Sequence, residues 1–341
     1  MEITAKMVKE LRDQTGAGMM DCKKALAECE CDMEKAVAWL RENGKNKQEK
    51  KASRVAAEGL VQEYVSGTGN TAVLLEMNIE TDFAAKNPEF RSFAEAIARQ
   101  VAEKKPKWLS KEEVPAGALE ESTVDVSAFC KENCLLDMPY IEDESRTVAD
   151  ALSDVFATIG ENMRIRRFVR YECGEDMPPT KTSGQLATYI HGGGRVGVMI
   201  EINSDSAEAN TNEELAATAR NLCMQIAAMS PRWLDESEVP TEVLEQEREI
   251  ARNTALNEGK PEKIVDKISE GRVKKFVADN TLMGQTYVRD ESKTCAQVIE
   301  DLSKKLGYNL SVRRFVRYEL GEGIEKKEDN FAEEVMKQLQ G

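Results

Sequence analysis

The chain has 341 residues, enough for two or three compact domains. Hydrophobic residues make up 41% and charged residues 32%, as in a soluble globular protein, and no apolar run is long enough to span a bilayer. With 47 basic and 62 acidic residues, the net charge of −15 should repel nucleic-acid phosphates. Composition therefore disfavours membrane insertion and direct nucleic-acid binding. The first residues lack the layout of a signal peptide, so we expect a cytoplasmic protein.

Residue types for catalysis and metal binding are scarce. His191 is the only histidine, so any Ser-His-Asp or Cys-His arrangement would have to use it. No glycine-rich nucleotide-binding motif occurs. The cysteine pairs 29/31 and 130/134 lack the two-residue spacing of a zinc knuckle, which favours buried, reduced thiols. We therefore expect a protein that is not an enzyme and that carries no cofactor or metal.

The sequence contains an internal repeat. Residues 166–172 and 313–319 are identical, and each run is followed by Gly-Glu at the same spacing. Further identical pairs stand at a constant offset of 125: Gly59/Gly184, Tyr64/Tyr189, Gly67/Gly192, Gly69/Gly194, Val73/Val198, Glu76/Glu201, Asn78/Asn203, Trp108/Trp233, Leu109/Leu234, Val114/Val239 and Pro115/Pro240. A constant offset over such a length indicates two copies of one supersecondary unit.

The N-terminal residues, 1–45, are predicted to form a small module of three helices. The expected helix caps are Thr4, Asp21 and Asp32, and the expected helix ends are Gly16 and Gly44. The polar stretch 46–56 is expected to be a linker or an exposed helical extension.

Between the first two helices lie Met19 and Met20. They either staple the helices together or offer an adaptable apolar contact to a partner, and the sequence alone does not decide between these roles.

The repeated part is predicted to be α+β, with a small antiparallel sheet and helices on one face in each copy. Each copy contains a hairpin, a helix, a second helix and a final strand. The first hairpin turns at Gly67, and the helix after it has Asn87 as its cap and Pro88 at its first position. Residues 110–150 show no clear pattern. The expected subdivisions are 57–180 for core subdomain one, 181–323 for core subdomain two, 241–280 for a helical hairpin and 324–341 for a C-terminal helix.

The repeated arginines have two interpretations. Strand alternation places Arg166 and Arg170 on the face opposite Val169 and Tyr171. In so acidic a protein, this pattern favours a solvated face with charge pairing over a groove for phosphates.

The copies differ after their hairpins. Residues 80–86 include Phe83, whereas the corresponding residues 205–211 have no aromatic side chain. Phe83 is either a staple on the following helix or an exposed wedge for a partner.

Five segments together resemble the bacterial elongation factor Ts family. The first two, which include Arg-Asp-Gln-Thr-Gly-Ala-Gly-Met-Met and Glu-Thr-Asp-Phe, are long and specific. The segments are residues 11–26, 76–84, 191–198, 271–276 and 321–326.

This resemblance implies a guanine-nucleotide exchange factor that binds elongation factor Tu and promotes GDP release by disturbing its magnesium and nucleotide site. It also implies a ubiquitin-associated-like N-terminal module and a coiled-coil hairpin. Thr81, Asp82, Phe83 and Ala84 match the motif that enters the partner, although the family usually has valine in place of Ala84. The resemblance implies four further partner-binding residues: Arg12, Met19, Met20 and His191.

Two other classes of function remain open at this point. One is a structural adapter that joins partners without affecting a nucleotide. The other is a direct RNA binder, which the net charge of −15 disfavours.

Overall fold

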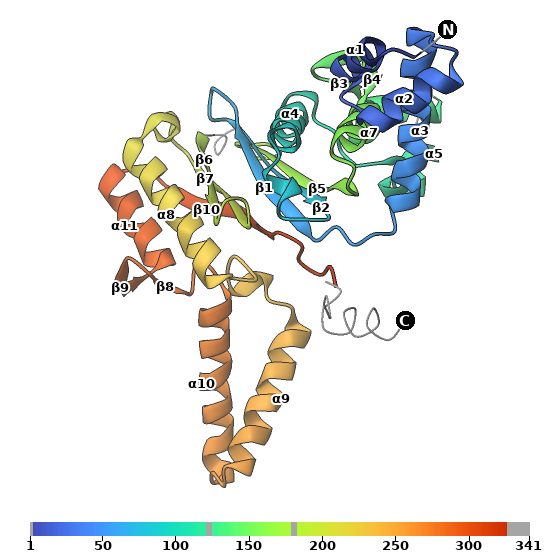
Figure 1. Ribbon diagram of the computed structural model, residues 1–341. Coiled ribbons are helices and arrows are strands. Elements are labelled where there is room, and N and C mark those ends of the chain that lie inside the picture. Colours follow the sequence, from blue (N-terminus) through green and yellow to red (C-terminus); the bar gives the residue numbers. More distant parts are fainter. Residues whose placement is uncertain (1–2, 121–124, 179–182, 326–341) are drawn as a thin grey trace. The chain divides into compact units, whose positions relative to one another are not determined.

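The computed structural model describes residues 3–120, 125–178 and 183–325, and it has a mixed α and β architecture (Figure 1). Two compact units divide the chain. The first comprises Met1–Gln62, Leu75–Phe168 and Glu319–Gly341, and the second comprises Glu63–Leu74 and Val169–Tyr318. Within the described residues, none of the helices combines the length and apolar character needed to cross a membrane.

Three helices begin the first unit: α1 (Ala5–Thr15), α2 (Met19–Glu28) and α3 (Met33–Lys51). The hydroxyl of Thr4 accepts a hydrogen bond from the Met7 amide, and Asp32 accepts one from the Lys35 amide, so both predicted caps are confirmed. Gly16 ends α1 in the left-handed conformation, as predicted. The module's small core consists of Val8, Leu11, Ala17, Cys22, Ala25, Leu26, Ala36 and Leu40.

Two predicted helix boundaries are wrong. Helix α2 begins at Met19 rather than at Asp21, with Gly18 as a cap that has no side chain to contribute. Helix α3 continues through Gly44 to Lys51, which makes most of the predicted linker a helical extension. Gly44 is buried, and a Cβ atom there would lie 3.8 Å from the Cβ of Ala157. Tertiary packing against this neighbouring helix outweighs the low helix propensity of glycine.

A three-stranded sheet with the order β1-β2-β5 follows. Its strands are β1 (Glu58–Val65), β2 (Thr71–Ile79) and β5 (Met163–Glu172). Helix α4 (Pro88–Lys104) has the predicted Asn87 cap, whose side chain accepts from the Glu89 amide. The predicted apolar stripe of α4 is buried: Phe90, Phe93, Ala94, Ile97 and Val101. Helix α7 (Val148–Ile159) begins with a capping box formed by Thr147 and Asp150.

The described part of residues 110–150, which showed no clear pattern, forms short elements. These are α5 (Ala116–Glu120), α6 (Val126–Asn133), β3 (Pro139–Tyr140) and β4 (Asp143–Thr147), with the last two paired antiparallel.

The second unit has a sheet of order β10-β7-β6. Strands β6 (Ser183–His191) and β7 (Val196–Ser204) form an antiparallel hairpin in which Ser183 pairs with Ser204 and His191 pairs with Val196. The apolar core lies between this sheet and its helices. The remaining elements are α8 (Glu213–Met229), β8 (Thr286–Tyr287), β9 (Asp290–Thr294), α11 (Cys295–Leu306) and β10 (Leu310–Glu319).

The same order of elements therefore occurs twice, and equivalent glycines occupy equivalent places. Gly59 and Gly184 have φ of 132° and 145°, and a Cβ atom at either would lie 2.0 Å from a carbonyl oxygen of the adjacent strand. Only glycine fits such a backbone approach. This close contact explains why the two positions share one residue type at the offset of 125.

Helices α9 (Thr241–Asn257) and α10 (Glu262–Asn280) form the predicted helical hairpin (Figure 1). Its seam is made of small or β-branched residues: Ala251, Ala255, Val265, Ser269 and Val273. The Ser269 hydroxyl donates to the carbonyl of Arg248 at 2.9 Å, across the seam. Small residues let the helices approach closely, and the larger side chains of Ile250, Leu256 and Ile264 remain exposed.

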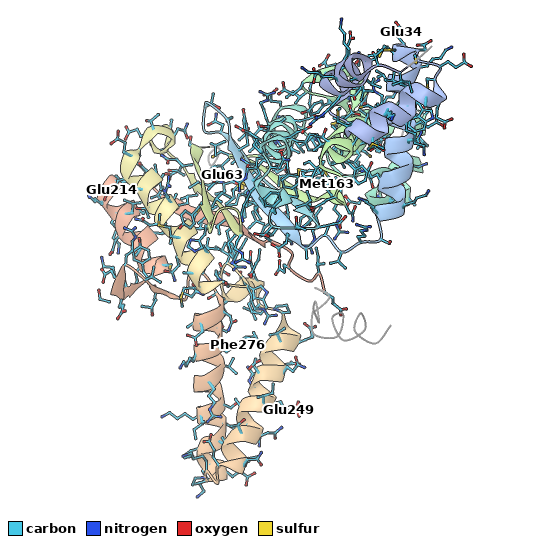
Figure 2. All side chains as sticks on the ribbon, in the orientation of Figure 1. Glu34, Glu63, Met163, Glu214, Glu249 and Phe276 are labelled. Atoms are coloured by element: carbon cyan, nitrogen blue, oxygen red, sulfur yellow. The ribbon has the colours of Figure 1, made fainter. Side chains whose placement is uncertain are left out.

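The hairpin is anchored near the end of α10 and carries mostly exposed charges along α9. Figure 2 labels Phe276 near the end of α10 and Glu249 on α9. The ring of Phe276 lies 6.3 Å from that of Trp233, which anchors α10 to the body of the second unit. Glu249 is exposed, as are most of the charged side chains on α9.

The repeated arginines bind a buried glutamate. In the first unit, Arg166 and Arg167 donate to the carboxylate of Glu76 at 2.8 and 2.6 Å, and the amide of Gly321 donates to it at 2.9 Å. Burial alone raises the pKa of Glu76, but these three hydrogen bonds outweigh it and the pKa is lowered. Charge pairing on this strand is therefore confirmed. The predicted solvated face is wrong, since both arginines are half-buried on a fully buried carboxylate.

The second unit repeats this arrangement. Glu201 accepts hydrogen bonds from Arg313 at 3.2 Å, from Arg314 at 2.6 Å and from the amide of Gly174 at 3.0 Å. In each unit, two arginines from one copy of the repeated run and the amide of the glycine that follows the other copy bind a buried acid. The predicted C-terminal helix, 324–341, lies almost wholly outside the described residues.

Candidate functional site

The turn that follows β2 is fixed by Thr81. Its backbone amide and its hydroxyl both donate to the carboxylate of Glu161, at 3.0 and 2.9 Å. The same hydroxyl accepts from the amide of Ala84, the first residue of the short 3-10 helix η1 (Ala84–Lys86), at 3.1 Å. Thr81 therefore connects the turn to a residue 80 positions further along the chain.

A second set of contacts holds the start of this turn. Glu80 accepts from the Asn162 amide at 2.6 Å and pairs with Arg54 at 3.3 Å. The side-chain amide of the buried Asn162 donates to the carbonyl of Arg54 at 2.8 Å. Residues Arg54, Glu80 and Asn162 therefore close a small polar ring behind the turn, so its backbone is supported on two sides.

Phe83 projects from this supported turn. It is 82% exposed, more than any other large hydrophobic residue among the described residues. The interpretation of Phe83 as a staple on α4 is therefore wrong. An apolar ring left in water gains roughly 1.5–3 kcal/mol when a partner buries it completely.

The neighbours of Phe83 have different roles. Asp82 pairs with Lys86 at 2.8 Å, and both side chains are exposed. The hydrogen bond and the positive charge of Lys86 lower the pKa of the Asp82 carboxyl, so this residue is an anion at neutral pH. Ala84 and Ala85 are buried beneath the turn. Ala84 thus packs inward, while Asp82 and Phe83 face the solvent.

The N-terminal helices carry a separate exposed surface. Met19 and Met20 at the start of α2 are 45% and 76% exposed, and Arg12 on α1 is also exposed. The Thr15 hydroxyl donates to the carbonyl of Leu11 at 2.6 Å and accepts from the Ala17 amide at 3.4 Å, which orders the connection between these helices. The interpretation of Met19 and Met20 as internal staples is wrong.

His191 belongs to the second unit, at the end of β6. Its Nδ1 lies 3.1 Å from the hydroxyl of Tyr189, and its side chain is exposed. Its carbonyl accepts from the amides of Gly194 and Arg195 at 3.3 and 3.1 Å and closes the hairpin turn. His191 is therefore an accessible side chain on an ordered loop.

The structure brings only part of the predicted site together. Thr81, Asp82, Phe83 and Ala84 form one turn, whereas Arg12, Met19 and Met20 lie on the helical module and His191 lies in the other unit. The supporting residues Glu161 and Asn162 were not predicted. A signal for Glu161 was present. The identical runs 166–172 and 313–319 stand at an offset of 147, and at this offset the counterpart of Glu161 is Tyr308.

These features define a class of protein. Exposed apolar side chains on ordered turns, carried by a frame of buried ion pairs, are typical of a protein that binds another protein.

Comparison with known proteins identifies the family. The model of the elongation factor TS family matches residues 80–322. The elongation factor Ts of Clostridium novyi is 47% identical over 337 residues, which cover 99% of each chain, and that of Clostridium perfringens is 47% identical over 335 residues and 98% of each chain. The elongation factor Ts of Clostridium acetobutylicum is 44% identical over 338 residues. The chain belongs to the elongation factor Ts family, the non-enzymatic nucleotide exchange factors of elongation factor Tu in translation elongation.

Proposed function

We propose that this protein promotes GDP release from elongation factor Tu by placing Phe83 against the magnesium and nucleotide site of the partner. The observation that carries this proposal is the 82% exposure of Phe83 on a turn held by Thr81 and Glu161. A rigid turn presents the ring without a further cost of ordering the loop on binding. The ring then contributes most binding free energy in the complex whose nucleotide is leaving or has left.

The required free energy indicates how many contacts are needed. Weakening nucleotide binding by ~10⁴-fold requires about 5.5 kcal/mol of differential binding. One buried aromatic side chain supplies about 2–4 kcal/mol. Other contacts must provide the rest, and they must be stronger in the nucleotide-free complex.

The other predicted residues receive roles that fit their positions. Asp82 places a negative charge beside Phe83, where it disfavours the nearby phosphates and competes for magnesium. Thr81 and the buried Ala84 position the turn. The partner contacts proposed outside the turn are Arg12, Met19, Met20 and His191, all of which are exposed.

The finer architecture is part of this proposal. We assign residues 1–45 to a ubiquitin-associated-like module, 46–56 to a connection that begins as the extension of α3, and 57–180 and 181–323 to the two copies of a duplicated core. The hairpin α9–α10 is assigned as a coiled coil, supported by its narrow seam and by the ion pairs Arg252–Asp266 and Arg272–Glu258. The place of action is the cytoplasm.

Measurement of GDP release tests the proposal. Elongation factor Tu loaded with fluorescent GDP is mixed with excess unlabelled GDP, with and without this protein. Phe83→Ala should slow the stimulated release by about 30- to 1000-fold, which corresponds to the loss of about 2–4 kcal/mol. The matched control Glu208→Ala, at the equivalent exposed position of the second unit, should leave the rate unchanged. Wild-type protein that fails to accelerate release would refute the function, and a fully active Phe83→Ala would refute the role of the ring.

A further inference from the structure

A cluster of two thiols and a carboxylate lies in the first unit, away from the turn described above. Cys130 lies in α6, Cys134 caps the end of that helix, and Asp137 ends the short 3-10 helix η3 (Leu135–Asp137). The Sγ atoms and a carboxylate oxygen of these residues all lie within 4.8 Å of one another. Among the described residues, these three side chains form the group whose donor atoms lie close enough together to hold a metal ion.

Two members of the cluster, Cys130 and Cys134, belong to a small group of buried residues. The third member of this buried group is Val114, and the partly buried rings of Trp108 and Phe129, 5.8 Å apart, pack against it. Both thiols are free, Cys134 has no exposed surface, and Asp137 is half-buried. The carboxylate of Asp137 is therefore the part of the cluster that reaches the solvent.

The second unit builds the same corner without these residues. Leu135 donates its amide to the carbonyl of Trp108 at 2.9 Å, and Leu282 donates to that of Trp233 at 2.9 Å. At the offset of 147 the counterparts of the three clustered residues are Val277, Thr281 and Gly284. The Thr281 hydroxyl donates locally, to the carbonyl of Val277 at 2.8 Å.

The corner of the second unit shows which residue types this backbone arrangement requires. Val277, Thr281 and Gly284 satisfy the backbone geometry, so the corner needs neither a thiol nor a carboxylate. The three donor atoms converge within 4.8 Å of one another, so a single ion can contact all of them. A cation is the species that would favour the ionised form of such a cluster.

We propose that Cys130, Cys134 and Asp137 form a binding site for Zn²⁺, with the fourth position open to water on the side of Asp137. Two sulfur ligands select zinc over magnesium and calcium. A tetrahedral site with Zn–S of about 2.3 Å and Zn–O of about 2.1 Å brings the donor atoms slightly closer than they lie now. Two protons leave the thiols for the solvent as the metal binds. The ion would then cross-link α6 to η3.

Metal titration of the full-length protein tests this site. The protein is reduced, stripped of metal and titrated with Zn²⁺ against a chromophoric chelator, and in parallel with Co²⁺. The wild type should bind one equivalent tightly, and Co²⁺ should give the ultraviolet charge-transfer band of thiolate ligands with the visible bands of a tetrahedral site. Failure to bind Zn²⁺ in competition with the chelator, or a Co²⁺ spectrum without a thiolate band, would overturn the proposal.

Variants taken from the second unit provide the controls. Cys130→Val combined with Cys134→Thr introduces the residues found at the equivalent corner, and it should remove the tight equivalent while circular dichroism shows retained structure. Asp137→Asn should weaken zinc binding at least about tenfold. The control Cys29→Ser with Cys31→Ser should bind as the wild type does. Unchanged binding by the first variant would contradict the site, and if that variant does not fold, the wild-type Co²⁺ spectrum still decides the question.

Discussion

The turn after β2 in the first unit and the turn after β7 in the second share one backbone plan. The Thr81 hydroxyl accepts from the Ala84 amide at 3.1 Å, and the Ser206 hydroxyl accepts from the Glu208 amide at 3.3 Å. Each turn contains a short 3-10 helix with a buried alanine, Ala84 in one and Ala209 in the other. Each ends at an asparagine that caps the next helix.

Their outward side chains differ. Phe83 corresponds to the exposed Glu208, and Asp82 corresponds to Ala207. The carboxylate of Glu161, which holds Thr81, is replaced in the second unit by Tyr308. The plan of the turn therefore does not require an aromatic residue or an outside carboxylate. The first unit has added an exposed ring and a residue that fixes the turn beneath it, which is what a partner-binding projection needs.

Both units share a frame in which arginines bind a buried glutamate, Glu76 in the first unit and Glu201 in the second. If these glutamates maintain the common frame, Glu76→Gln should reduce the free energy of unfolding by about 3 kcal/mol at pH 7, because two half-buried arginines lose their charged partner. Glu201→Gln should do the same in the second unit. Chemical denaturation followed by circular dichroism measures both. A neutral result for either substitution would break the equivalence of the two frames.

The pH dependence of this effect has a defined sign. The pKa of Glu76 is lowered in the folded protein, so its stabilisation is complete above the ordinary glutamate pKa of about 4.3 and is lost as the pH falls through the lowered value. The difference in stability between the wild type and Glu76→Gln should therefore shrink in acid. A difference that stays constant down to pH values of about 2 would contradict the ionic account.

The residue that fixes the turn should affect activity more than stability. Glu161→Ala removes the acceptor of both Thr81 hydrogen bonds, and we expect stimulated GDP release to fall roughly tenfold because Phe83 is no longer held in place. Glu144→Ala, which removes only a surface ion pair with Lys104, is the control and should be silent. Equal rates for the two variants would show that the turn needs no outside support.

The methionine surface should have the smallest effect. Met20→Ala should weaken the complex with nucleotide-free elongation factor Tu about fivefold, because it removes one exposed apolar contact of about 1 kcal/mol. Calorimetric titration measures the affinity. Met229→Ala changes an exposed methionine of the second unit and should leave the affinity unaltered. A stronger effect from Met229→Ala than from Met20→Ala would place the partner contact on the second unit and contradict this prediction.

Local signals in the sequence predicted much of the fold. The Thr4, Asp32 and Asn87 caps were recognisable because a cap and the helix it begins are adjacent in the chain. The missed features depend on distant residues. Helix α3 passes Gly44 because Ala157 packs beside it, and α5, α6, β3 and β4 are too short to show a period.

The candidate site was predictable for a related reason. Comparing the two copies singled out Phe83 without a structure, since its counterpart is not aromatic. The choice between a staple and a projection needed the coordinates, because exposure depends on what packs nearby. Glu161 acts across 80 residues, so no local pattern could assign it to Thr81.

The most direct test of the central claim measures the affinity of wild-type protein and Phe83→Ala for elongation factor Tu in two states, nucleotide-free and GDP-bound. If the ring acts by differential binding, Phe83→Ala must weaken the nucleotide-free complex by about 30-fold or more while changing the GDP-bound complex much less. An equal loss of affinity for the two states would contradict the account, because the ring would then bind the partner without loosening its nucleotide.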